Sequence, residues 1–139
     1  MVTAQTADTL RAAFLAADAI FVPDIKASTA GIHVAKVLAH LGIADEVALR
    51  LKIYPNGATA MGELAASSAT RPIGCTQSTE IIATKGVQLS GSLPKGCDLA
   101  TTYTAGVAAR AAHAREAQAL IDVLTSVAAK DARARAGFL

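Results

Sequence analysis

Residues 20–31 read Ile20-Phe21-Val22-Pro23-Asp24-Ile25-Lys26-Ala27-Ser28-Thr29-Ala30-Gly31. This stretch is an apolar run that ends in a small polar turn and then opens a helix-like segment. The same theme returns from Ile53-Tyr54 into Asn56-Gly57-Ala58-Thr59 and from Ile73-Gly74-Cys75 into Thr76-Gln77-Ser78-Thr79. Strands that alternate with helices build a parallel sheet whose strands all end at the same edge. The sequence therefore predicts an α/β fold, a three-layer sandwich with a central, largely parallel sheet flanked by helices.

The spacing of apolar residues extends this prediction along the chain. Helices are expected over residues 6–17, 29–41, 44–51, 58–66, 78–83, 114–127 and 129–136. Strands are expected over residues 19–22, 52–54, 73–75, 87–89 and 99–109.

Composition narrows the class of protein. Of the 139 residues, 53% are hydrophobic and only 4% are aromatic, which suits one domain whose core is built from aliphatic side chains. The net charge is +2 and the basic residues are scattered, so neither a basic stripe nor a set of stacking aromatic residues is present for nucleic acid. We therefore expect no nucleic-acid partner.

Targeting and cysteine usage add two expectations. No stretch is long and apolar enough to span a bilayer, and residues 1–6 lack the charged start and apolar core of a signal peptide. The chain as written is expected in the cytoplasm, or in the periplasm if it is a piece of a longer precursor. Cys75 and Cys97 are too few for a disulfide framework and lack zinc-site spacing, so no metal or cofactor is expected.

The three strand–helix junctions supply the candidate site. In parallel sheets, ligands bind beyond the carboxyl ends of the strands, where helix N-termini present unpaired N–H groups. These junctions carry hydroxyls, amides and glycines, and Asp24 is the one acidic residue just upstream. Such groups suit a small anion or polar ligand. The candidate ligand-binding residues are Ser28, Thr29, Ala30, Gly31, Asn56, Gly57, Thr76, Gln77 and Ser78.

The residues of the first two junctions also have a purely structural reading. Ser28 is a favoured N-cap in any protein, and Asn56 with Gly57 forms a plausible turn and cap. Gln77 differs from these residues, because it is a polar group at a strand end and its burial without a partner would be costly. This cost favours contact with a ligand.

Signals for catalysis are weak. His33 and His40 lie two turns apart on one expected helix, ~10.5 Å, which is too far for both to bind one metal. Cys75 lacks a recognisable partner base, and Glu63 and Glu80 read as surface or cap residues. We expect a non-catalytic protein, and an enzyme using Cys75 or His33 is a lesser hypothesis.

The order and spacing of several motifs carry a family resemblance. They are Phe21-Val22-Pro23-Asp24, Ser28-Thr29-Ala30-Gly31-Ile32, Leu41-Gly42-Ile43, Asn56-Gly57, Ile73-Gly74-Cys75-Thr76-Gln77-Ser78-Thr79-Glu80-Ile81, Gly86-Val87, Leu93-Pro94 and Tyr103-Thr104-Ala105-Gly106-Val107. Over roughly residues 7–138 the chain resembles the carboxyl-terminal half of molybdate-type substrate-binding proteins of ABC transporters, which are type II periplasmic binding proteins.

This resemblance implies a two-lobed clamp. Residues 1–100 would form the α/β ligand-binding lobe, and residues 101–139 a returning hinge strand with the carboxyl-terminal helices, all in one compact unit. The first part of the other lobe has no counterpart in this sequence. Leu120, Ile121, Leu124 and Val127 would then form an exposed apolar stripe that folds back or pairs with a second copy, which predicts a homodimer.

The function that the resemblance implies is solute capture. The lobe would bind a small oxyanion or organic anion and present it to the membrane component of an ABC transporter. Thr76 stands where molybdate binders usually place a tyrosine, so another oxyanion or a small organic acid is an equal candidate. The alternatives are an effector-sensing domain of a cytosolic regulator and a self-associating scaffold without ligand.

Overall fold

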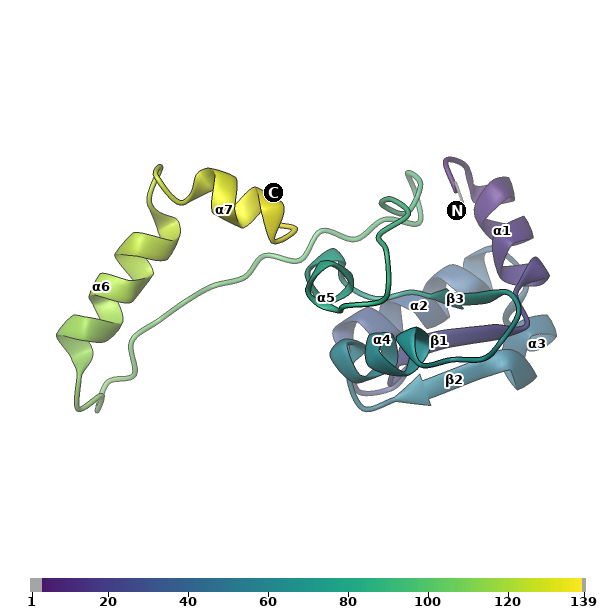
Figure 1. The fold of residues 1–139 in the computed structure, drawn as a ribbon, viewed down its shortest axis with the longest axis horizontal. Helices are drawn as coiled ribbons and strands as arrows, with labels where there is room; N and C mark the ends of the chain where they lie inside the picture. The colour runs from purple at the N-terminus through teal and green to yellow at the C-terminus, as the bar shows by residue number, and fades with distance from the viewer. Residues whose placement is uncertain (1–3, 139) are drawn as a thin grey trace. The chain divides into compact units, whose positions relative to one another are not determined.

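The chain folds into two compact units in the computed structural model, which describes residues 4–138 (Figure 1). Unit 1 comprises residues 1–99 and unit 2 comprises residues 100–139. None of the helices in residues 4–138 combines the length and the apolar character needed to cross a bilayer.

Unit 1 alternates helices with strands, as the sequence predicts. Its elements are α1 (Ala7–Ala16), β1 (Ala19–Pro23), α2 (Thr29–His40), α3 (Ala44–Val47), a 3₁₀ turn (Ala48–Arg50), β2 (Leu51–Tyr54), α4 (Gly57–Ala65), β3 (Pro72–Gly74) and α5 (Ser78–Ala83). The predicted helices and strands of residues 6–83 are therefore confirmed to within one or two residues. One detail differs, because the helix expected over residues 44–51 ends as a 3₁₀ turn.

The three strands form one parallel sheet in the order β2-β1-β3 (Figure 1). Ile20 of the central strand pairs with Leu51 on one side and with Ile73 on the other. All five residues of β1 are buried, which explains why this strand is a continuous apolar run rather than an alternating one.

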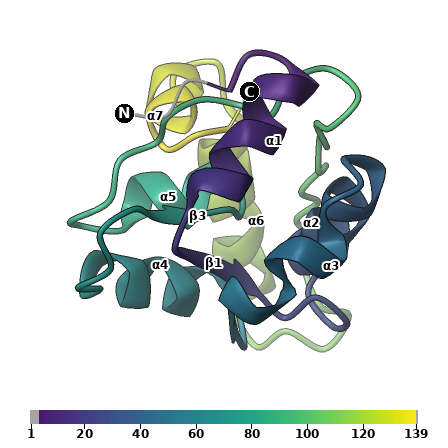
Figure 2. The ribbon, with the colours of Figure 1, turned by 90° about the vertical axis from the view of Figure 1, so that its right-hand side faces the viewer.

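Helices cover both faces of this sheet, which confirms the three-layer sandwich. Side chains of a strand point alternately to its two faces. Ile20 and Val22 join a first core with α1, α2 and α3, whereas Ala19 and Phe21 join a second core with α4. Figure 2 shows α4 on one side of β1, and α2 and α3 on the other. The first core contains Leu10, Phe14, Ala17, Ile20, Val22, Val34, Val37, Leu38, Ile43, Val47 and Cys97, and the second contains Ala19, Phe21, Ala60 and Met61.

The strands expected over residues 87–89 and 99–109 are wrong, because residues 84–113 contain no helix or strand. A strand is stabilised by a hydrogen-bonded neighbour and a buried face, so strand-forming residue types alone do not produce one. Leu99 and Tyr103 are more than half exposed, so the apolar positions of the second segment have no surface to cover. The predicted returning hinge strand is therefore absent from this structure.

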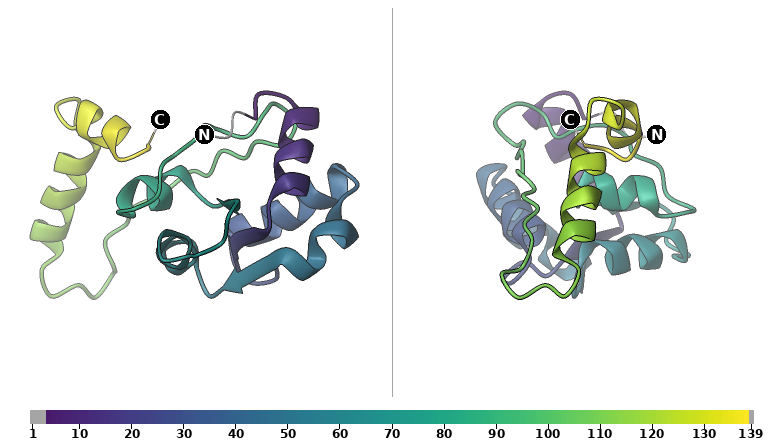
Figure 3. Two further views of the ribbon diagram at one scale, coloured as in Figure 1. Left: turned by 45° about the vertical axis from the view of Figure 1, so that its right-hand side comes forward. Right: turned by 90° about the vertical axis from the view of Figure 1, so that its left-hand side faces the viewer.

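Unit 2 contains α6 (Ala114–Thr125) and α7 (Lys130–Arg135), slightly shorter than the predicted helices (Figure 3). Arg133 joins them, since its guanidinium donates to the carbonyl oxygens of Leu124 at 2.6 Å and Ser126 at 2.8 Å. The rings of Tyr103 and Phe138 meet edge to face with centroids 5.3 Å apart. No residue between 100 and 138 is buried, so this unit has no core of its own.

The apolar stripe predicted on α6 is largely exposed. The exposed fractions are 59% for Leu120, 51% for Leu124 and 89% for Val127, whereas Ile121 is half-buried. Pairing with a second copy, and the roles assigned to residues 1–100 and 101–139, stay predictions.

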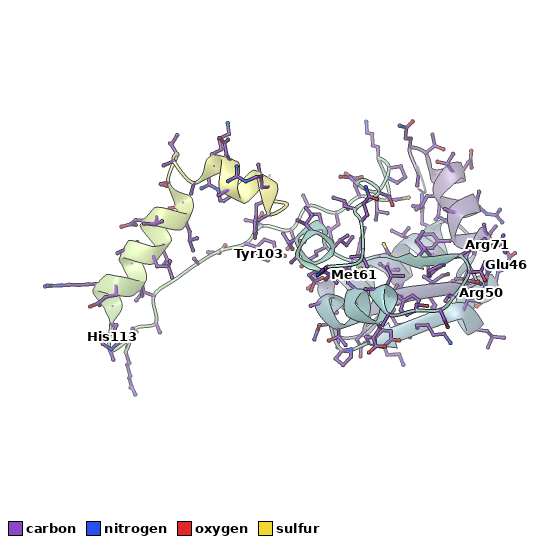
Figure 4. The ribbon with its side chains drawn as sticks, in the orientation of Figure 1. Glu46, Arg50, Met61, Arg71, Tyr103 and His113 are labelled. Carbon is purple, nitrogen blue, oxygen red and sulfur yellow. The ribbon has the colours of Figure 1, made fainter. Side chains whose placement is uncertain are left out.

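Two side chains fasten the amino ends of the strands. The Arg50 guanidinium donates to the carbonyl oxygens of Leu15 at 2.7 Å and Ala17 at 2.6 Å, which lie at the carboxyl end of α1. Asp18 accepts from the backbone N–H groups of Thr70 at 2.9 Å and Arg71 at 3.0 Å. Figure 4 shows Arg50 and Arg71 at the end of the sheet where β2 and β3 begin. Arg50 therefore satisfies carbonyl groups that a helix end leaves without partners.

Replacement of Arg50 by Ala should lower the free energy of unfolding by about 2–3 kcal/mol, because charge-assisted hydrogen bonds to helix-end carbonyls are lost. Arg50→Lys should recover only part of this, since an ammonium cannot serve several acceptors with a planar fork. Urea denaturation measures both, with exposed Lys36→Ala as the control. An Arg50→Ala variant within about 0.5 kcal/mol of the parent would contradict the assignment.

Candidate functional site

The carboxyl ends of the three strands gather the predicted junctions at one edge of the sheet. β1 and β3 are neighbours, and the backbone N–H of Cys75 still donates to the Phe21 carbonyl at 3.0 Å just past the end of β3. After β1 the chain enters α2 on the first-core face, whereas after β3 it enters α5, which packs with α4 on the other face. Connections that diverge in this way from adjacent parallel strands open a crevice between them, where ligands of α/β proteins bind.

The first junction is a turn held by Asp24. Its Oδ1 accepts from the backbone N–H groups of Lys26 at 2.7 Å and Ala27 at 3.0 Å. These hydrogen bonds, that of Lys26 first, hold the pKa of Asp24 below its ordinary value. The carboxylate is therefore committed to the turn itself.

Ser28 is the N-cap of α2, and its Oγ lies 3.5 Å from the Gly31 nitrogen. Thr29 is exposed and Ala30 is half-buried in the first turn, where backbone N–H groups lack partners within the helix. The structural reading of Ser28 as a cap is thus confirmed, and the first turn of α2 begins just past the end of β1.

Gly31 marks a close approach between α2 and the end of β1. A Cβ atom built on Gly31 would overlap the carbonyl groups of Pro23 and Asp24. Only glycine allows the first turn of α2 to lie directly on the backbone that leaves the central strand.

The second and third junctions meet each other. Asn56 is the N-cap of α4, accepting from the Thr59 N–H at 2.8 Å, and Gly57 is the first residue of the helix. A Cβ atom built on Gly57 would overlap both the Thr76 Oγ1 and the Glu80 carboxylate. Thr76 Oγ1 in turn donates to Glu80 Oε2 at 2.5 Å. The start of α4, the end of β3 and the first turn of α5 therefore converge.

Glu80 is the site residue that sequence reasoning missed. The sequence predicts a surface or cap residue at this position, yet the Glu80 carboxylate lies at the positive end of the α4 dipole. The available signal was the spacing of Thr76 and Glu80, because residues four apart meet on one side of a helical turn.

The remaining predicted residues complete this edge. Gln77 directly precedes α5 and Ser78 is its first residue, and both are half-buried. Ser28 to Gly31 lie at the same edge of the sheet but on the α2 side. The structure thus brings Gly57 and Thr76 into contact, and it places the first junction at the adjacent strand end.

Two other features bear on the chemistry of the chain, namely clusters of possible metal ligands and the ring of His33. Residues 4–138 contain no group of three His, Cys, Asp or Glu side chains that could hold a metal ion. The His33 ring is engaged through Nε2 with the Cys97 carbonyl at 2.8 Å.

A cavity of about 320 Å³ lies at the opposite edge of the sheet, between α1 and the start of β3, and its walls are mainly apolar.

Comparison with known proteins gives one match. A family model described as bacterial extracellular solute-binding protein matches residues 3–139. No curated protein matches this chain, and no solved structure does.

Replacement of Gly57 by Ala should lower the free energy of unfolding by about 1–3 kcal/mol, because the new methyl group overlaps Thr76 and Glu80. The matched control is Gly62→Ala in the same helix, where a Cβ meets nothing within 4 Å. That variant should gain up to about 1 kcal/mol from helix propensity. Equal effects of the two substitutions in chemical denaturation would contradict the convergence described here.

Replacement of Gly31 by Ala should destabilise more than Gly57→Ala. Its methyl group meets backbone carbonyls of residues 23 and 24, which cannot move aside as the Glu80 side chain can. A denaturation midpoint above that of Gly57→Ala would be inconsistent with the close approach of α2 to β1.

Cys75 should resist thiol reagents in the folded protein. Cys75 is half-buried against the first core, and the loss of solvent around its sulfur raises the pKa of the thiol to about 12, so almost no thiolate exists near neutral pH. Iodoacetamide at pH 8 should modify Cys75 only after denaturant is added, as read by peptide mass spectrometry. Rapid labelling of Cys75 in the native protein would restore the enzyme hypothesis.

The same shift has a consequence for stability. Because the folded pKa lies above the unfolded value of about 9, ionisation favours the unfolded chain. The stabilising contribution is complete below pH 9 and should fall as the pH rises from about 9 towards about 12, whereas Cys75→Ala should remove this dependence.

Proposed function

The chain belongs to the bacterial extracellular solute-binding protein family, and from that membership we propose that unit 1 is a lobe that captures a small solute for an ABC-type transporter. The observation that carries the proposal is the family match over residues 3–139, together with a parallel sheet whose three strands end at one edge. Membership supports a binding role rather than a catalytic one. The family description also places such proteins outside the cytoplasm, so we propose an extracellular or periplasmic location.

The ligand that we propose is a small oxyanion or organic anion bound at the start of α2. This helix has 12 residues, and its first turn presents backbone N–H groups beside the hydroxyls of Ser28 and Thr29. An anion there gains hydrogen bonds and the favourable end of the helix dipole without any formal positive charge.

The position of Glu80 favours the start of α2 over the start of α4 as the anion site. Its carboxylate already lies at the start of α4, against Gly57 and Thr76, so a second anion there would meet like charge. Asn56, Gly57, Thr76, Gln77 and Ser78 then serve as the far wall of the crevice. Thr76 and Gln77 are the polar members of that wall closest in sequence to the end of β3.

A thermal-shift screen tests the ligand class. The panel is molybdate, tungstate, sulfate, phosphate and small carboxylates, with a neutral sugar and a diamine for comparison. A one-site anion at 100 times its dissociation constant should add ~2.7 kcal/mol and raise the melting midpoint by several degrees. Shifts confined to the sugar or the diamine would overturn the anion proposal.

A pair of variants at residue 29 tests the position. Thr29 is the first residue of α2, where proline fits a helix but has no N–H, and Ser28 before it is already extended as proline requires. Thr29→Pro should weaken binding of the active anion at least tenfold, whereas Thr29→Ala, which keeps the N–H, should weaken it less. Equal affinities in the two variants by titration calorimetry would place the anion elsewhere.

A further inference from the structure

The segment that follows α5 crosses from one core of unit 1 to the other. Val87 packs against the second core, whereas Leu93 and Cys97 belong to the first. Because the two cores lie on opposite faces of the sheet, residues 88–92 have to pass around it. Figure 1 shows the chain after α5 running past β3, on the side away from β2.

This segment ends in a small hydrogen-bonded turn. The Cys97 N–H donates to the Pro94 carbonyl at 2.9 Å, and the Gly96 N–H donates to Asp98 Oδ1 at 2.9 Å. Cys97 is only 1% exposed, and no residue from 98 to 138 is buried. Cys97 is thus the last point at which the described chain is anchored in the core of unit 1.

His33 of α2 forms a hydrogen bond to this turn. Its Nε2 lies 2.8 Å from the Cys97 carbonyl oxygen, a contact between residues 64 positions apart. A carbonyl can only accept, so Nε2 carries the hydrogen and donates it. Val34 and Val37 of the same helix share the first core with Cys97, so the hydrogen bond and the apolar packing act together.

We propose that His33 is a positioning residue that fastens the exit of the chain from unit 1 to the first turns of α2. His33 lies four residues after Thr29, one helical turn from the proposed anion site. A solute that orders the first turn of α2 therefore also steadies the turn at residues 94–97, from which the chain departs toward residue 100. This second statement rests on the proposed function, whereas the fastening itself does not.

Hydrogen exchange on the full chain, followed by mass spectrometry, tests the fastening through two replacements of His33. A glutamine amide reaches the position of Nε2 and can donate there, whereas the shorter asparagine amide reaches only the position of Nδ1. His33→Asn should raise the exchange rate of the peptide spanning residues 93–98 at least tenfold. His33→Gln should stay within about threefold of the parent, which corresponds to less than ~0.7 kcal/mol. The control is His40→Ala, an exposed histidine of the same helix, which should leave this peptide unchanged.

Three outcomes would overturn the proposal. The first is an exchange rate of residues 93–98 in His33→Asn that equals that of the parent. The second is an equal rise of this rate in both His33 variants. The third is faster exchange in the β1 peptide as well. The last would mean that His33 supports the whole fold rather than the exit segment. For the case in which His33→Asn does not fold, ¹⁵N spectra of the parent imidazole decide, because the proposal requires the Nε2–H tautomer at neutral pH. An Nδ1–H tautomer would refute it.

A second arm adds molybdate or sulfate in excess. Slower exchange of residues 93–98 in the parent, and its absence in His33→Asn, would support coupling to the solute site. Binding without any change in this peptide would refute the coupling. If neither anion binds the parent, molybdate and sulfate are excluded as the solute, while the comparison of the His33 variants still decides whether the residue fastens the chain.

Discussion

Burial of β1 on both faces and along both edges is the constraint on which the rest of unit 1 depends. Ile20 and Val22 enter one core while Ala19 and Phe21 enter the other, and β2 and β3 take up its backbone hydrogen bonds. A shift of one residue in register would exchange the two sets of side chains between the faces. The pairing is therefore fixed, and with it the edge of the sheet at which all three strands end.

That common end explains why the polar junctions meet. Gly31 allows α2 to start directly on the backbone leaving β1, and Gly57 allows the Glu80 carboxylate to lie at the start of α4. Two of the acidic groups near the edge are already engaged, Asp24 with turn amides and Glu80 with Thr76. The Asp24 carboxylate lies in the turn before α2 and is bonded to the amides of that turn, whereas the Glu80 carboxylate lies directly against the first residue of α4. The charge distribution of the edge, rather than its shape alone, thus favours one helix over the other.

The sequence predicted unit 1 well because its signals are local. An apolar run followed by a cap residue such as Ser28 or Asn56 is enough to place a strand and the helix after it, and both caps appear as expected. Residues 99–109 carry a similar strand-forming pattern, yet a strand also needs a neighbour, which no local pattern supplies. The contact of Glu80 with Gly57 and the contact of His33 with Cys97 could not be predicted, for a related reason. Each depends on which segments the fold brings together, over 23 residues for Gly57 and Glu80 and over 64 for the histidine.

The most direct test of a solute site at the carboxyl edge is a titration of the ¹⁵N-labelled protein with the anion that gives the largest thermal shift, followed by amide chemical shifts. The account predicts that the largest, saturable changes fall on the amides of Thr29 and Ala30, with smaller ones at Gln77 and Ser78. Changes centred on Thr70 and Arg71 at the opposite edge would contradict it, because they would place the ligand against α1 and the start of β3.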